Sequence, residues 1–203
     1  YRRHFNQPIA GVLKADGIAD YGIVYVNGEK VGELNAVTGV DSLEVEVPFN
    51  STLDILVENM GRINYGARIS ESFKGFVRPI TINDNPIEGE WKMYCLPMSE
   101  APVLAAGDHG YAKGLPVIYQ GQFDVASPGD TFLDMEEWGK GIVFVNGVNL
   151  GRYWKVGPQQ TLYLPGCFLK KGKNDIVIFE QQNDVRHDHV SGIDTPKLDI
   201  LKK

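Results

Sequence analysis

One glycine-flanked segment carries side chains suited to hold a polar ligand. The segment Gly61-Arg62-Ile63-Asn64-Tyr65-Gly66 follows a strand-like run and combines a guanidinium, an amide and a phenol. These groups can hydrogen-bond sugar hydroxyls, and the phenol can also stack on a sugar ring. Arg62, Asn64 and Tyr65 are therefore the first candidates for a carbohydrate-binding role.

A second candidate segment is Arg152-Tyr153-Trp154. An indole face can stack on the C–H face of a pyranose, which makes Arg152 and Trp154 candidates for sugar binding. The alternative is a packed aromatic corner with the guanidinium stacked on it, and the pattern favours packing.

The remaining acidic and imidazole side chains do not form a convincing catalytic or metal-binding set. Asp134, Glu136 and Glu137 cluster near a predicted turn, as expected for solvated turn acids. His187-Asp188-His189 supplies two imidazoles, whereas zinc takes three or four ligands. We predict no catalytic residue, no metal site and no cofactor.

Composition excludes several function classes. The 203 residues carry a formal net charge of −6, and 43% are hydrophobic, as in ordinary globular proteins. An acidic balance argues against a nucleic-acid partner, and no apolar run is long enough to span a membrane as a helix. The two cysteines, Cys95 and Cys167, are too few for a disulfide framework and are expected to be small buried apolar residues.

Short strands must position the candidate side chains, because β-branched or alternating runs punctuated by glycine and proline dominate the chain. The clearest runs are Ile23–Val26, Leu43–Val47, Leu53–Val57, Thr161–Leu164 and Asp175–Phe179. Asn27-Gly28 and Asn146-Gly147 each follow such a run and predict type I′ hairpin turns. No segment supports a long amphipathic helix, and at most a short helical turn is expected near 134–138.

An internal repeat organises the chain. Residues 22–32 align with 141–151, an offset of 119, and flanking pieces align at similar offsets. Asp54 aligns with Asp175, and Gly75 and Pro79 align with Gly192 and Pro196. A period this long indicates two copies of one domain rather than a solenoid.

The repeat also predicts the domain boundary. We expect a first β-sandwich over residues 1–86, lacking one or more N-terminal strands, and a second over 87–203. The predicted fold class is all-β, with two tandem antiparallel sandwiches of jelly-roll type.

Two long segments resemble a known family. Residues 139–154 and 157–165 are similar to the C-terminal region of glycoside hydrolase family 35 β-galactosidases, and residues 56–66 and 73–75 match a second signature of that family. The resemblance covers essentially the whole chain and implies galactose-binding-like jelly-roll domains that follow a catalytic (β/α)₈ barrel.

The resemblance also implies what this chain lacks. Family members cleave terminal β-D-galactosyl residues with retention, using two carboxylates about 5–5.5 Å apart. No residue here matches either barrel glutamate, so we expect this piece of a longer or processed polypeptide to be inactive alone.

The implied partners are the catalytic barrel of the parent chain and, through it, a galactoside substrate; homo-oligomer formation stays open. Residues 61–66 are expected to face the barrel, either bracing it or contacting the aglycone side of the substrate. The family suggests a secreted, periplasmic or lysosomal location. The alternative functions are a stand-alone galactoside-binding module and a free-standing structural protein.

Overall fold

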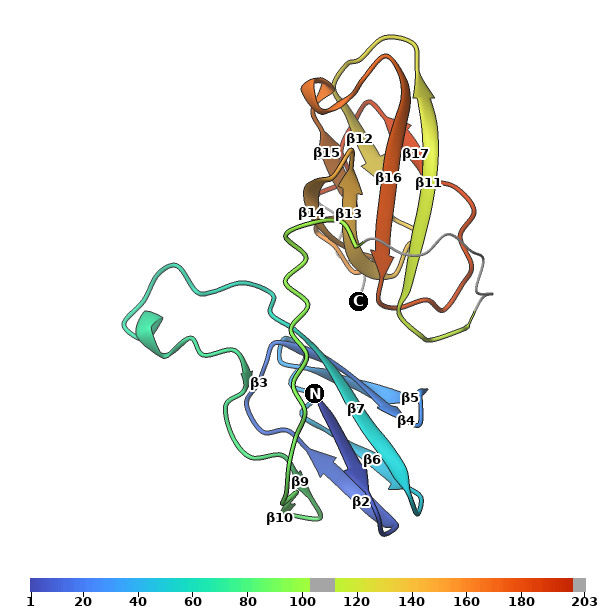
Figure 1. Cartoon of the computed structure of the whole chain (residues 1–203). Helices are drawn as coiled ribbons and strands as arrows, with labels where there is room; N and C mark the ends of the chain where they lie inside the picture. Colours follow the sequence, from blue (N-terminus) through green and yellow to red (C-terminus); the bar gives the residue numbers. More distant parts are fainter. Residues whose placement is uncertain (103–111, 199–203) are drawn as a thin grey trace. The chain divides into compact units, whose positions relative to one another are not determined.

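The computed structural model describes residues 1–102 and 112–198. The chain divides into two compact units, Tyr1–Cys95 and Leu96–Lys203, and each is described by itself. Both are built from antiparallel strands, and the helices in the described ranges are two short 3₁₀ turns, η1 (Ile69–Glu71) and η2 (Gly166–Phe168) (Figure 1). The all-β prediction is therefore confirmed. Neither of these two turns, the helical segments of the described ranges, has the length or apolar character of a membrane-spanning helix.

The first unit contains two four-stranded sheets. One has the order β1-β7-β4-β5, formed by Arg2–Phe5, Ser51–Glu58, Tyr21–Val26 and Glu29–Asn35. The other has the order β10-β9-β2-β6, formed by Asn85–Pro86, Thr81–Ile82, Ile9–Lys14 and Ser42–Val47. A small ladder joins β3 (Ile18–Ala19) to β8 (Gly75–Phe76).

The second unit contains a four-stranded and a three-stranded sheet. The larger has the order β11-β16-β13-β14, formed by Val117–Val125, Gly172–Glu180, Lys140–Val145 and Val148–Trp154. The smaller has the order β15-β12-β17, formed by Thr161–Leu164, Thr131–Asp134 and Ser191–Ile193.

Each unit has its own hydrophobic core between its two sheets. Alternate side chains point inward because successive strand residues face opposite sides of a sheet. The fully buried members of the first core include Leu13, Val24, Leu34, Leu53 and Ile55. Those of the second include Met135, Val143, Val145, Tyr153 and Leu164.

The predicted duplication is present in the strand pairing. Both large sheets have the same order of equivalent strands, and Val24 pairs with Gly32 as Val143 pairs with Gly151. A bulge follows at the same place in both hairpins. Both residues of each Asn-Gly turn have positive φ, between 51° and 83°, as a type I′ turn requires.

The strand register corrects two of the flanking alignments. Tyr25 pairs with Asp54, and its equivalent Phe144 pairs with Val177, so Asp54 corresponds to Val177 and not to Asp175. Gly75 lies in β8, whereas Gly192 lies in β17, whose counterpart is β9. Sequence similarity misplaced these positions because the connections differ in length between the copies.

The second of these errors shifts the domain boundary. The first unit extends to Cys95 instead of ending at residue 86, since Ile87 and Trp91 pack against its core and Lys92 pairs with Arg2. Each strand in the two sheets of the second unit has a counterpart in the first unit. The described strands therefore do not indicate which N-terminal strand the first unit would lack.

Two smaller expectations also change. Both cysteines are exposed and free, not buried. The segment after β12 forms a turn without a helix, and it places Met135 and Trp138 in the second core.

Candidate functional site

The first candidate segment lies in a long loop between β7 and β8, here called the arm and defined as residues 59–74 (Figure 1). Asp20 anchors both ends of the arm. Its Oδ2 accepts a hydrogen bond from the Met60 backbone N–H at 2.7 Å, and its carboxylate pairs with Lys74 Nζ at 2.7 and 2.9 Å. Two anchors on one side chain hold the base of the arm on the first sandwich.

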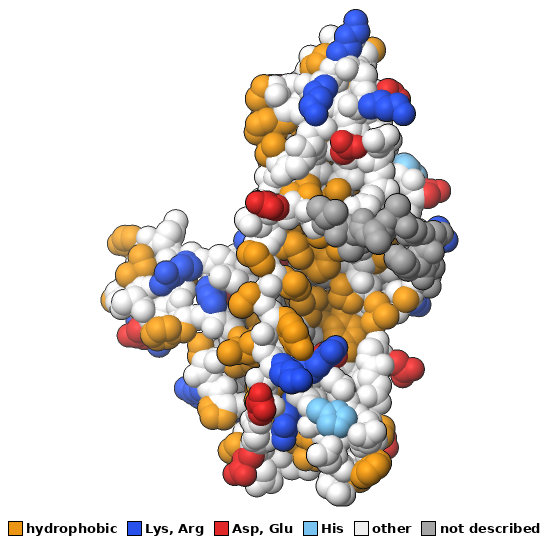
Figure 2. All heavy atoms as spheres, in the orientation of Figure 1, with side chains coloured by type: hydrophobic (Ala, Val, Ile, Leu, Met, Phe, Trp, Pro, Cys, Tyr) orange, Lys and Arg blue, Asp and Glu red, His pale blue; other side chains and the backbone are white. Residues whose placement is uncertain are grey.

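Between these anchors the arm exposes its side chains. Arg62, Asn64 and Tyr65 are all exposed, and Tyr65 retains 91% of its accessible surface. The exposed apolar side chains of the arm are Ile63, Tyr65, Ile69 and Phe73. In Figure 2 this protrusion, at the left of the view, shows hydrophobic and basic side chains together. Four exposed apolar side chains on one loop make the arm a candidate interaction surface.

The second candidate pair lies on β14 of the other unit. Arg152 and Trp154 are both half-buried, and Tyr153 between them is buried in the core. Lys140 Nζ lies 5.0 Å from the centroid of the Trp154 ring, within cation–π range. The two candidate sets therefore belong to different units.

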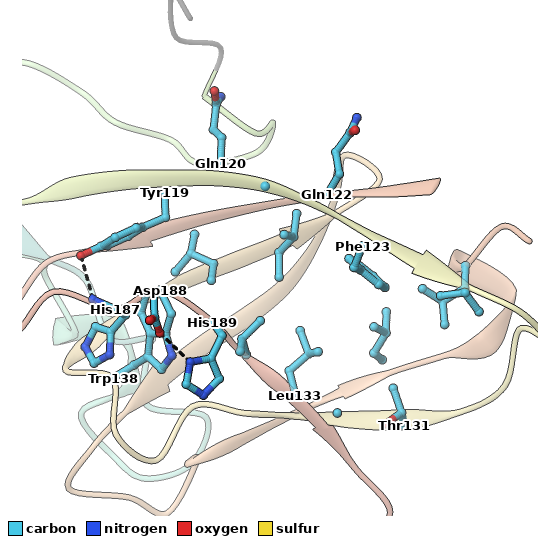
Figure 3. A pocket seen from close by; sticks show the side chains of 18 of the residues that line it. Tyr119, Gln120, Gln122, Phe123, Thr131, Leu133, Trp138, His187, Asp188 and His189 are labelled. Atoms are coloured by element: carbon cyan, nitrogen blue, oxygen red, sulfur yellow. Dashed lines mark hydrogen bonds and ion pairs between the residues drawn. The ribbon is translucent and has the colours of Figure 1, made fainter. Parts of the chain in front are cut away.

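The second sandwich contains a cavity of about 620 Å³ between β11 and β12, here called the slot (Figure 3). Its apolar wall is formed by Phe123, Leu133, Leu164, Ile176 and Ile178. Figure 3 shows Tyr119 and Phe123 pointing into the slot, whereas Gln120 and Gln122 point away from it. Cavities of this size accommodate ligands or side chains of a partner.

A cluster of aromatic and imidazole rings forms one end of the slot. The His187 ring stacks on Trp138 with centroids 4.2 Å apart, and Tyr119 meets Trp138 edge-on at 5.1 Å. Tyr119 Oη donates to Asn183 Oδ1 at 2.8 Å. Burial lowers the pKa of His187, which favours a neutral ring against the indole.

The polar groups at this end do not form a metal site. His189 Nδ1 lies 2.6 Å from Asp188 Oδ1, and both side chains are exposed. Among the described residues, no group of three or more His, Cys, Asp or Glu side chains could hold a metal ion.

The acidic turn behind β12 has a structural partner. Asp134 and Glu136 each accept a hydrogen bond from Lys197 Nζ at 2.7 Å, and these bonds raise the pKa of Lys197. The shared lysine therefore forms ion pairs with both carboxylates of this turn and ties the turn to the segment after β17.

Sequence reasoning missed the slot. One usable signal was available: in the alignment of β1 with β11, Arg3 of the first copy is replaced by Gly121 in the second. A glycine at an inward-facing strand position removes a side chain from the wall and widens the space between the sheets.

The fold is a tandem pair of β-sandwich domains, of which the first carries the arm and the second contains the slot. Comparison with known proteins identifies both domains. Residues 1–97 match the model for "Beta-galactosidase, first all-beta domain", and residues 116–174 match "Beta-galactosidase, galactose-binding domain".

Curated relatives agree with these matches. The chain is 39% identical over 181 residues to human "Beta-galactosidase-1-like protein 2", covering 85% of this chain and 28% of the relative. It is 41% identical over 165 residues to "Beta-galactosidase" of Xanthomonas manihotis, covering 81% of this chain and 27% of the relative. The chain therefore belongs to the β-galactosidase family and spans just over a quarter of the length of these relatives.

Proposed function

We propose that this chain is the non-catalytic C-terminal region of a glycoside hydrolase family 35 β-galactosidase whose sandwiches support the catalytic barrel and its active-site rim. The parent enzyme hydrolyses terminal non-reducing β-D-galactosyl residues. The longer relatives contain polypeptide that this chain does not cover, and our proposal assigns the catalytic barrel to that part.

The exposed arm is the observation that carries this proposal. Its apolar side chains contribute little to the first core, since the exposed fractions are 91% for Tyr65 and 67% for Phe73. Burial of such side chains against another domain stabilises by about 25 cal/mol for each Å² of apolar surface. The arm thus has the anchored base and the exposed apolar side chains expected of a bracing element.

The test uses the full-length enzyme with Phe73→Ala in the arm. We expect a lower melting temperature of the barrel and a lower kcat/KM, because the rim loses a contact that orders it. Phe49→Ala is the matched control, since Phe49 has the same exposed fraction of 67% in the turn between β6 and β7. Equal behaviour of the two variants would contradict bracing by the arm.

Tyr65→Ala separates bracing from substrate contact. A bracing role predicts that barrel stability falls while relative activity on different galactosides stays constant. A contact with the aglycone predicts altered preference among galactosides at unchanged barrel stability. Loss of neither property would reject both roles for Tyr65.

A second candidate function is binding of galactosides by the second sandwich. The galactose-binding domain model covers residues 116–174, which include Arg152 and Trp154. Calorimetric titration of the chain with galactose and lactose tests this candidate. Heat that disappears in Trp154→Ala supports it, whereas no heat at millimolar sugar argues for a purely supporting role.

A further inference from the structure

The duplicated fold allows the slot to be compared with its equivalent in the first sandwich. In the first sheet, Asp54 pairs with Arg2 on one side and with Tyr25 on the other. In the second sheet, Val177 pairs in the same way with Gln120 and Phe144. The strand positions of Tyr1, Arg3 and Phe5 therefore correspond to those of Tyr119, Gly121 and Phe123.

In the first sandwich, a segment of the same chain closes this side. The Arg2 and Lys92 backbones exchange two hydrogen bonds, Arg2 N–H to Lys92 O at 2.8 Å and Lys92 N–H to Arg2 O at 2.9 Å. The segment thereby adds to the free edge of β1. Trp91 and Ile87 from the same segment pack against the first core.

The arginine of β1 completes this closure. Arg3 donates from Nη1 to the Glu90 backbone oxygen at 3.1 Å, and its guanidinium lies 5.7 Å from the centroid of the Phe5 ring. Arg3 and the segment that carries Trp91 therefore lie together along β1, the strand that corresponds to β11 beside the slot.

The second sandwich has neither of these groups. Gly121 replaces the arginine, and a Cβ placed there would meet only Ile176, at 3.6 Å. β11 pairs with β16 on one edge, and within residues 112–198 no strand pairs with its other edge. An unpaired edge beside an apolar slot is the arrangement that accepts an added strand.

We infer that the slot is a docking site for an extended polypeptide segment that adds to the free edge of β11 and inserts one bulky aromatic side chain beside Phe123 and Gly121. The segment belongs to the polypeptide outside this chain, since the relatives are more than three times as long. The assignment of this segment to the parent polypeptide rests on the proposed function. The apolar lining of the slot does not depend on that function.

The occupant is a strand and not a sugar because of the wall composition. The slot is lined mainly by aliphatic and aromatic side chains, with fewer polar ones, among them Thr131, Asp188 and His189. The amides of Gln120 and Gln122 on β11 point away from it (Figure 3). A sugar needs hydrogen-bonding partners around its ring, whereas an indole needs apolar contacts of the kind that Trp91 makes in the first core.

The test uses the chain's own closing segment as the probe. A synthetic peptide of residues 87–94 is titrated into the ¹⁵N-labelled full chain, in which the equivalent place of the first sandwich is already occupied in cis. We expect saturable shifts of the Gly121, Gly192 and Trp138 resonances. Replacing Trp91 by Ala in the peptide should weaken binding roughly tenfold or more.

Two variants of the protein make the result specific. Gly121→Leu fills the slot and should abolish peptide binding, whereas Gln122→Leu adds the same side chain on the opposite face of β11 and should leave binding unchanged. The Gly121 backbone does not have positive φ, so leucine fits the strand conformation.

Three results would overturn the inference: no saturable shift, equal binding by the Gly121→Leu variant, or shifts of the same resonances by galactose or lactose instead of the peptide. None of these results bears on the arm, so the bracing role would stand or fall separately. Conversely, if Phe73→Ala in the arm changed neither stability nor activity, the peptide titration would still test the slot.

Discussion

A buried carboxylate supports the second sandwich, and its loss should be measurable. Glu180 at the end of β16 is fully buried. Its Oε1 accepts from the backbone N–H groups of Lys140 at 2.9 Å and Gln182 at 2.8 Å. Its Oε2 accepts from the Gly139 N–H at 2.9 Å and from Tyr153 Oη at 3.1 Å. The side chain thus joins the start of β13 to the end of β16.

Glu180→Gln keeps the shape and removes part of this acceptor capacity. Whichever carboxylate oxygen becomes the amide NH₂ then faces at least one backbone N–H donor. A buried donor left unsatisfied costs about 1–3 kcal/mol, and the remaining bonds weaken because the acceptor is no longer charged. The relief of burying a charge offsets part of this cost. We therefore expect a loss of roughly 2–4 kcal/mol in the free energy of unfolding of the second sandwich.

Urea unfolding measured by tryptophan fluorescence tests this value. The chain has three tryptophans, and in a Trp91→Phe background the remaining two, Trp138 and Trp154, both report on the second unit. With a urea slope of about 1–3 kcal/mol/M, the expected loss lowers the midpoint by roughly 1–2 M. Glu180→Ala should cost more than Glu180→Gln, since it removes all four acceptor contacts.

Glu137→Gln is the control, because Glu137 is an exposed carboxylate in the same unit. Surface changes of this kind usually alter stability by less than about 0.5 kcal/mol. If Glu180→Gln and Glu137→Gln unfold at the same urea concentration, the four contacts do not stabilise the fold and the reasoning fails.

Three further predictions follow from the same physical arguments. Burial, and then the nearby Glu180 charge, raise the pKa of Tyr153 well above its usual 10.0. The stability that the neutral phenol provides is therefore complete below pH 10.0 and declines above it. Tyr153→Phe should show a shallower decline in melting temperature at alkaline pH. Gly141→Ala should destabilise the second sandwich by about 1–3 kcal/mol or more, since its Cβ would collide with strand backbone, while Gly129→Ala, in open space, should match wild type in urea. Asp20→Asn weakens both anchors of the arm, so trypsin should cut the arm several-fold faster in limited proteolysis; unchanged cleavage would show that the anchors do not restrain it.

The local patterns that predicted the strands were sound because they depend on neighbouring residues. Alternation in Leu43–Val47 and Leu53–Val57 became β6 and β7, each with one buried face. The two Asn-Gly pairs predicted both hairpins, since only residues that tolerate positive φ fit a type I′ turn. The repeat over residues 22–32 and 141–151 was equally reliable, because both strands and their turn share one register.

The candidate site was less accessible to sequence reasoning. Arg62 and Tyr65 were identified by residue type, but only the structure shows that the arm exposes them from an anchored base. The burial of Glu180 also had no signal in the repeat, because the equivalent position in the first copy is Val57, which is apolar.

Strand period and turn chemistry are properties of short segments, so the order of the amino acids was enough to predict a duplicated β-sandwich. Only the three-dimensional arrangement shows that one copy is closed by its own Trp91, whereas the other keeps an apolar slot beside an edge of β11 with which no strand of residues 112–198 pairs. The physical reason is that closure depends on where a distant segment returns to the sheet, and connections of different length can carry that segment to different places without changing the strands themselves.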